Sequence, residues 1–262
     1  MIGKDMAKRS HWGTLITNHQ TRHKGYSFVD AQWSDIVTLE DIDQVDGRIF
    51  AEYRAKGSDP VVLDEDRYEV YRNPDHPRYF FRRLMWASLL SGGHATYGGI
   101  HNYLPFEQDS VSYFPKEEWH LFGMQGYFDV GLEGADDFKH ITQFFKETRQ
   151  TLVGMTPNDA LTGNKPQEFK CIHNDSVYIV YLANPDRTGD ILPKKNEYNF
   201  LRSGNESSET PVVTINLPQL SFTYKWFDPT SGNWSDTGKV KGGEIKMSAP
   251  AGGDWILLLI KE

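Results

Sequence analysis

Residues 61–70 (VVLDEDRYEV) place an acidic cluster directly after a short apolar run. The run 61–63 favours a buried β-strand, and the acids 64–66 follow it with no turn residue between them. Parallel strands present functional side chains at their carboxyl ends, which makes Glu65 the best candidate for a catalytic carboxylate. Such a carboxylate could attack an anomeric carbon or stabilise an oxocarbenium ion. The alternative is a surface strand in which Glu65 pairs with Arg67.

Polar and aromatic side chains follow other short β-favouring runs, and the same rule selects them as substrate contacts. They are His19, Asp30, Gln32, Trp33, Tyr68 and Tyr97. Carboxylate, amide and aromatic groups together suit hydroxyl hydrogen bonds and ring stacking, the usual means of binding a sugar. Two alternatives stay open here: Asp35, next to this set, caps a following helix, and Trp33 belongs to the core.

Other kinds of chemistry find little support in the sequence. His11, His19 and His23 have no accompanying carboxylates in a recognised ligand spacing, so no metal site is expected. The chain contains no GxSxG elbow, GxGxxG loop or P-loop, which disfavours serine hydrolases, dinucleotide enzymes and NTPases. We expect no cofactor.

The composition is that of a globular protein, with 38% hydrophobic and 24% charged residues. A net charge of -8 and the absence of basic runs argue against nucleic acid as a main partner. No apolar stretch approaches the roughly 18 residues of a membrane span, and the first residues have no signal-peptide core. The single cysteine, Cys171, excludes an intramolecular disulfide and is expected to be a buried hydrophobe. Neither compartment nor oligomeric state follows from these features.

Up to about residue 157, short apolar runs alternate with helical patterns, which indicates βαβ units and a parallel sheet. Strands are expected at 12–19, 26–33, 60–65 and 94–99, and helices at 41–57, 76–93 and 134–149. The pair Gly92-Gly93 suits a left-handed cap at the end of the second helix. Four strands cannot close a barrel of eight, so the simplest interpretation is the second half of a (β/α) barrel. A free-standing four-stranded α/β sheet is the alternative.

After about residue 165 the helical pattern is replaced by short alternating runs separated by turn residues. Strands are expected at 176–183, 211–217, 222–229, 243–250 and 254–260, with a long loop over 184–210. The spacing indicates an antiparallel β-sandwich of roughly 95 residues, with Trp226 and Trp255 in its core. The predicted fold class is thus α/β plus all-β: a partial TIM-type barrel over 1–160, followed by a β-sandwich over 165–262.

Two stretches, PVVLDEDRYE (60–69) and RRLMWASLLSGGHATYGG (82–99), resemble the C-terminal half of the apiosidase-like glycoside hydrolase barrel. The later stretches YKWFDPTSGNW (224–234) and GDWILLL (253–259) resemble the β-sandwich that commonly follows this barrel, which is sometimes labelled a collagen-binding domain. The two resemblances together cover nearly the whole chain. Their motifs are distinctive in combination and weak singly.

The resemblance implies a retaining, two-carboxylate glycosidase with Glu65 as nucleophile, a plant- or matrix-type polysaccharide as substrate, and a secreted or periplasmic location. The family's acid/base is an Asp in a Gly-Gly-Asp type motif, which this sequence does not contain. Asp30 and Asp35 are the only stand-ins that we can offer. The residues Leu63-Asp64 also replace the usual lead into the Glu.

A second hypothesis is a non-catalytic carbohydrate- or matrix-binding protein whose contact surface is formed by Trp226, Trp234 and Trp255. Exposed, coplanar tryptophans would favour binding, whereas buried ones would indicate an ordinary core. A third hypothesis is a truncated product with no function of its own.

Overall fold

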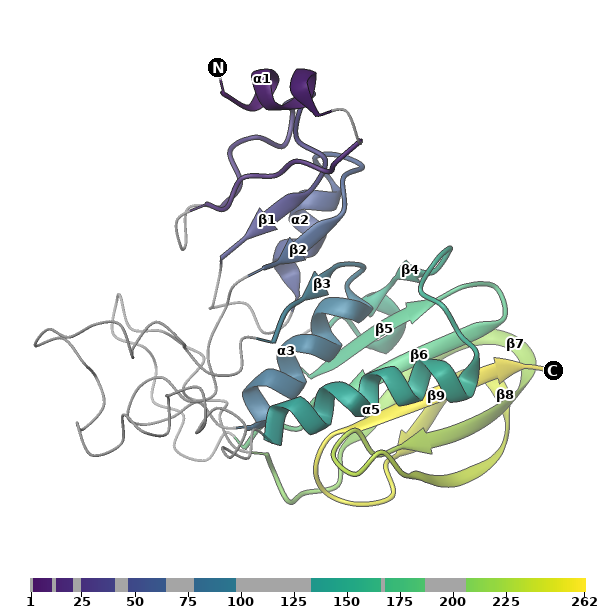
Figure 1. The fold of residues 1–262 in the computed structure, drawn as a ribbon. Helices are drawn as coiled ribbons and strands as arrows, with labels where there is room; N and C mark the ends of the chain where they lie inside the picture. The colour runs from purple at the N-terminus through teal and green to yellow at the C-terminus, as the bar shows by residue number, and fades with distance from the viewer. Residues whose placement is uncertain are drawn as a thin grey trace, which may run out of the picture.

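The structure, a computed structural model, describes residues 2–10, 13–20, 25–40, 47–64, 78–97, 133–165, 168–186 and 206–262. Two sheets organise these residues, one parallel with three strands and one antiparallel with six. Helices lie between and beside the sheets (Figure 1). The chain is therefore a mixed α/β protein.

The parallel sheet has the order β1-β2-β3. Its strands are β1 (Val37–Leu39), β2 (Val61–Leu63) and β3 (His94–Ala95). β2 and β3 fall where the sequence predicted strands. Apolar side chains of β1 and β2 are buried against the helices, as the run 61–63 had indicated.

The strand predicted at 26–33 is wrong, because residues 27–30 and 32–33 form turns. Tyr26 is buried in these turns, and its hydroxyl forms a hydrogen bond with the hydroxyl of Ser34. The predicted strand at 12–19 is also not formed as such over the described part, 13–19. That segment instead lies beside the start of β1, held by hydrogen bonds of Ile16 to Asp35 and of Thr17 to Ile36 and Thr38.

The helices are α1 (Ile2–Arg9), α2 (Arg48–Arg54), α3 (Arg78–Leu90), α5 (Glu133–Thr148) and the short 3-10 helix η4 (Asp159–Thr162). α3 and α5 match their predictions closely. α2 ends at Arg54, before the predicted end at Gly57, and residues 41–46 of the predicted helix lie outside the described residues.

The glycine pair ends α3 as predicted. Gly92 has a φ of 77°, which only glycine adopts without a steric cost. The Gly93 amide donates to the carbonyl of Ser88 at 3.1 Å, so a carbonyl of the last helical turn is satisfied. A side chain at Gly93 would also collide with Phe50, at 1.9 Å from the new Cβ. This tight turn brings the chain directly into β3.

The antiparallel sheet has the order β4-β5-β6-β9-β7-β8. Its strands are β4 (Thr156–Pro157), β5 (Phe169–His173), β6 (Val177–Leu182), β7 (Val212–Phe227), β8 (Trp234–Ser248) and β9 (Trp255–Lys261). The two strands predicted at 211–217 and 222–229 are one long strand, β7, which changes register between Leu217 and Ser221. The expected sandwich is therefore one continuous hydrogen-bonded sheet.

The two faces of this sheet belong to different cores. One face, with Ile179, Tyr181 and Leu258, shares a core with α3, α5 and the parallel sheet. The other face, with Cys171 and Trp226, packs against Val213, Ile215 and Leu217 from the first half of β7. β7 thus extends over the sheet to which its own second half belongs. Figure 1 shows α3 and α5 lying across the first face.

Among the residues that the structure describes, no helix is both long and apolar enough to cross a bilayer.

Candidate functional site

Three strands end together at the carboxyl edge of the parallel sheet. Leu39 is paired with Leu63, and Leu63 with Ala95. The pairing continues one residue further, because the Asp64 amide donates to the Leu39 carbonyl at 3.0 Å. The Thr96 amide likewise donates to the Leu63 carbonyl at 2.9 Å. Asp64 and Thr96, the first residues after β2 and β3, therefore lie at the same edge of the sheet as the end of β1.

Thr96 joins the ends of β2 and β3 through its side chain. Its hydroxyl donates to the carbonyl of Leu63 at 3.3 Å and also to the carbonyl of Asp64. The next residue, Tyr97, is half-buried and meets the Phe81 ring of α3 edge-on, with centroids 5.4 Å apart. The hydroxyl of Thr96 thus holds the backbone of Asp64, the residue that follows β2.

The residues proposed from the sequence lie at different places relative to this edge. Glu65 and Tyr68 lie outside the described residues, and their roles stay predictions; Glu65 follows Asp64 directly in the chain. Tyr97 lies at the edge itself. His19 is exposed, and the segment before it lies beside β1. That placement follows from the Thr17 hydroxyl, which lies 2.6 Å from the hydroxyl of Thr38.

Asp30, Gln32 and Trp33 lie elsewhere. They belong to the turns that lead into β1 and so lie toward its amino end. Trp33 packs on Phe28 at 4.9 Å between ring centroids and faces α1 at Gly3. Gln32 and Trp33 also line a small cavity of about 210 Å³ beside α1. The structure does not bring these three residues to the carboxyl edge, and their contact with sugar stays a prediction.

Asp35 precedes a strand, so the alternative that it caps a helix is wrong. Its carboxylate accepts a hydrogen bond from the Ile16 amide at 2.8 Å, and its own amide donates to the Ile16 carbonyl at 2.8 Å. Asp35 therefore holds segment 13–19 against the start of β1. The Asp35 carboxylate thus has a structural role.

The strongest electrostatic perturbations occur in a buried cluster between α3, α5 and β9. The members of this buried ion cluster are Arg78, Arg82, Asp137, Tyr181, Glu206 and Asp254. Arg82 donates to Asp254 through Nε at 3.0 Å and Nη2 at 2.8 Å, and through Nη2 to Glu206 at 2.8 Å. Arg78 donates to both oxygens of Asp137, at 2.9 and 2.6 Å. Tyr181 donates its hydroxyl to Asp254 at 2.7 Å.

Burial and charge shift the pKa values in this buried ion cluster in opposite directions. Burial, aided by the neighbouring Asp254, raises the pKa of Glu206 to about 8. Burial alone would also raise the pKa of Asp254, but the Arg82 charge and several hydrogen bonds hold it below its usual range. Desolvation raises the pKa of Asp137 above its usual value. Arg78 and Arg82 pair with Asp137 and Asp254, and Glu206 is a carboxyl of this cluster whose pKa is raised into the neutral range.

Perturbed pKa values are typical of functional sites, but ion-pair networks shift them equally. The side chains of Asp137 and Asp254 are fully buried, and that of Arg82 is 2% exposed. A substrate has no access to these three groups, and their ion pairs connect α3 with α5 and with the start of β9. A helix that places two arginines, Arg82 and Arg83, among apolar residues was a signal that the sequence analysis did not use.

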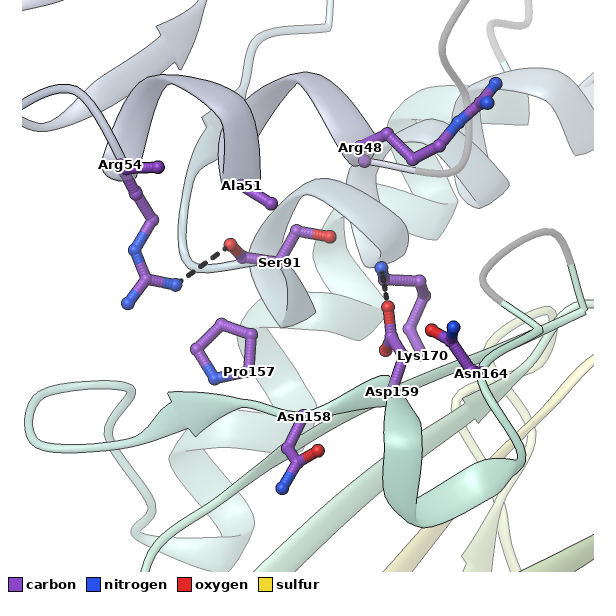
Figure 2. A pocket seen from close by; sticks show the side chains of 11 residues that line it. Arg48, Ala51, Arg54, Ser91, Pro157, Asn158, Asp159, Asn164 and Lys170 are labelled. Carbon is purple, nitrogen blue, oxygen red and sulfur yellow. Dashed lines mark hydrogen bonds and ion pairs between the residues drawn. The ribbon is translucent and has the colours of Figure 1, made fainter.

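A cavity with a volume of about 770 Å³ is formed by described residues. It lies between α2, the turn after α3, and the β4–η4–β5 segment, as Figure 2 shows. Its polar lining comprises Arg48, Arg54, Ser91, Asn158, Asp159, Asn164 and Lys170. Ser91 lies shortly before β3 begins, so the cavity is on the amino side of the parallel sheet. The sequence analysis selected none of these residues, since only the fold brings them together.

Two other expectations can be compared with the structure. The described residues include no group of three or more His, Cys, Asp or Glu side chains arranged to hold a metal ion.

Trp226 and Trp255 are 2% and 8% exposed, and their rings meet edge-on. Trp234 is half-buried on Phe144, with centroids 5.5 Å apart. Trp226 and Trp255 are core residues as expected, Trp234 packs at the edge of the core, and the three do not form a coplanar exposed surface.

No protein-family model matches the chain, and no curated protein matches it. Solved structures do match. A glycoside hydrolase family 5 protein from Bacteroides vulgatus ATCC 8482 has a TM-score of 0.69 at 14% identity, over 95% of this chain and 56% of its own. A protein described as "Glycoside hydrolase" has a TM-score of 0.62 at 14% identity, over 89% of this chain and 54% of its own.

A second protein of the same Bacteroides strain, named provisionally as a glycoside hydrolase, has a TM-score of 0.65 at 12% identity, over 99% of this chain and 47% of its own. At these identities the likeness shows the fold. This chain thus has the fold of part of several glycoside hydrolase structures and spans about half the length of each.

Proposed function

We propose that this chain supplies the carboxyl-terminal part of a glycoside hydrolase barrel and its attached β-sheet, and that Glu65 is the nucleophile of a retaining mechanism. The substrate is a plant- or matrix-type polysaccharide. The observation that carries the proposal is the pairing at the carboxyl edge, where β2 leads into Asp64 beside the ends of β1 and β3. Likeness to the fold of glycoside hydrolase structures supports the reaction class.

A retaining mechanism needs two carboxyl groups about 5–5.5 Å apart, one attacking the anomeric carbon and one protonating the leaving oxygen. Glu40 and Asp64 are the described carboxylates that directly follow strands at this edge. Asp35 is bonded to the Ile16 amide, and Asp30 lies toward the amino end of β1. The acid/base role is therefore best sought at the carboxyl edge, or in a part of the barrel that lies outside this chain.

The test is hydrolysis of a panel of activated aryl glycosides by the full chain and by its Glu65→Gln variant. We expect the variant to lose on the order of 10³-fold or more in kcat, because the covalent step no longer has a nucleophile. Azide should restore turnover in Glu65→Ala and yield a glycosyl azide, which a merely structural role for Glu65 would not produce. Equal rates for wild type and Glu65→Gln would refute the assignment.

A further inference from the structure

The cavity beside α2 is separate from the proposed reaction site. It lies on the amino side of the parallel sheet, whereas Asp64, Thr96 and Tyr97 mark the carboxyl edge. Its volume of about 770 Å³ falls in the range of roughly 300–1,000 Å³ that is usual for small-molecule sites. It is larger than a single inorganic anion needs and can hold one or more sugar rings.

Positive charge dominates the lining of the cavity. Three cationic side chains, Arg48, Arg54 and Lys170, line it together with one carboxylate, Asp159. This excess is local, since the whole chain carries a net charge of -8. An anion in the cavity would therefore meet the positive charge of Arg54.

Asp159 is already engaged by groups of the protein. Its Oδ2 bonds the ammonium of Lys170, which is 4% exposed, and its Oδ1 accepts from the Cys171 amide at 3.0 Å. These contacts fix a rigid floor and neutralise one of the three cations. Figure 2 shows this pair on one side of the cavity and Arg54 on the other.

Arg54 keeps most of its hydrogen-bonding capacity for a ligand. Its Nη1 donates to the Ser91 carbonyl at 3.3 Å, which holds the guanidinium over the cavity. A guanidinium has five N–H donors. Among the described residues, the Ser91 carbonyl accepts a hydrogen bond from one of them. The free fork matches the two oxygens of a carboxylate, an arrangement that arginine favours over lysine.

The remaining lining suits a sugar ring. The side-chain amides of Asn158 and Asn164 make no hydrogen bond with any described residue, and each offers both a donor and an acceptor to hydroxyl groups. Ala51, Ala55 and Pro157 form an apolar wall against which a ring can pack. The Arg54 charge at one end of the cavity favours an anionic group. The two amides and the apolar wall favour a hydroxylated ring, so the expected ligand is both anionic and hydroxylated.

We propose that this cavity is a binding site for a carboxylate-bearing sugar unit, a uronate residue of an acidic polysaccharide, with Arg54 pairing with the carboxylate. Asn158 and Asn164 bond ring hydroxyls. The site holds a polysaccharide away from the reaction edge and does not take part in bond cleavage.

The inference rests on the proposed function only in taking a polysaccharide as the ligand. Its test measures binding to the resting protein, so it gives an answer whether or not any glycoside is cleaved. Loss of hydrolysis in Glu65→Gln with intact uronate binding would separate the two sites.

The experiment is a calorimetric titration of the full chain with oligogalacturonate and with oligoglucuronate, each of three units. The fully methyl-esterified oligomers serve as matched neutral probes. We expect at least one acidic oligomer to bind, its neutral ester to bind about tenfold more weakly, and added NaCl to weaken the acidic complex. Arg54→Gln should lower the affinity by roughly 10- to 100-fold, because a charge-assisted pair is removed.

The control is Arg9→Gln, which removes an exposed arginine of α1 and should leave affinity unchanged. Asn164→Gly tests the amide without straining the backbone, because Asn164 has a φ of 57° that glycine adopts freely. We expect this variant to bind several-fold more weakly, and it substitutes for Arg54→Gln if that variant folds poorly. Absence of binding by both acidic oligomers, or equal affinities of wild type, Arg54→Gln and Asn164→Gly, would overturn the proposal.

Discussion

Arg82 and Asp254 lie 172 positions apart in the sequence and form a fork-shaped ion pair that is almost completely buried. Arg82 belongs to α3, the helix that follows β2, and Asp254 directly precedes β9 of the antiparallel sheet. The pair therefore connects the helix behind the proposed reaction edge to the centre of the second sheet. Tyr181 on β6 adds a hydrogen bond to the same carboxylate, so three elements converge on one group.

Replacing Arg82 by Met tests this connection. Removal of one partner leaves Asp254 charged and without its counter-ion in a buried site, which costs about 3–5 kcal/mol in the free energy of unfolding. Denaturant unfolding should show this loss. The same substitution at the exposed Arg9 should change the free energy by less than about 0.5 kcal/mol. A stable Arg82→Met variant would mean that the pair contributes little.

The raised pKa of Glu206 predicts a dependence of stability on pH. The folded state holds this proton up to about pH 8, while the unfolded chain releases it near the ordinary value of 4.5. The Glu206 contribution to stability is therefore greatest below about pH 4.5 and is lost progressively as the pH rises toward 8. Glu206→Gln, which mimics the protonated form, should remove this part of the pH dependence.

The measurement is the difference in Tm between wild type and Glu206→Gln from pH 5 to pH 9. We expect the variant to gain on wild type as pH rises, by at least about 1 kcal/mol or roughly 2–4 °C in Tm. Glu209→Gln, an exposed neighbour, is the matched control. A constant difference at all pH values would contradict a raised pKa at Glu206.

Thr96→Val tests whether the hydroxyl of Thr96 positions the segment that leads into Glu65. Valine keeps the branched shape but removes the donor to the carbonyls of Leu63 and Asp64. We expect kcat on an activated aryl glycoside to fall roughly tenfold or more, because small displacements of a catalytic group are costly. KM and Tm should change little. Thr96→Ser should recover most of kcat, and an unchanged kcat in Thr96→Val would exclude the positioning role.

The shared core predicts that residues 1–160 will not fold when separated from the rest of the chain. Trp86 of α3 and Phe144 of α5 are fully buried, and Trp86 stacks on Tyr181 of the antiparallel sheet. Removing the sheet would expose this apolar surface to water, at about 25 cal/mol for each Å². We expect the 1–160 fragment to aggregate or to bind a hydrophobic dye. A cooperative thermal transition in that fragment would contradict the expectation.

Local patterns predicted the long helices and the positions of β6 and β9 well, whereas the run 243–250 marked only the end of β8. The apolar spacing of α3 and α5 and the glycine pair after Leu90 are complete within short windows of sequence. β1 was missed because only three residues, 37–39, pair in it. The run 26–33 was mistaken for a strand because Tyr26 and Phe28 favour strands, while the backbone is set by turns and by the bond from Tyr26 to Ser34.

Long-range relationships were not accessible from local patterns. Pro218 and the polar residues after it read as the end of a strand, yet β7 continues through them after a change of register. The cavity beside α2 and the buried ion cluster join residues far apart in sequence, and no spacing rule finds them. The acid cluster at 64–66 was recognisable from the sequence because its residues are consecutive and directly follow an apolar run.

Cys171 lies in β5 with no exposed surface, and burial raises the pKa of its thiol to about 12. A thiol of this kind stays protonated at neutral pH and does not react with maleimides while the fold is intact. Cysteines introduced at exposed positions can thus be labelled selectively without first replacing the native one. The chain is ready for fluorophore or spin-label pairs that report distances in solution.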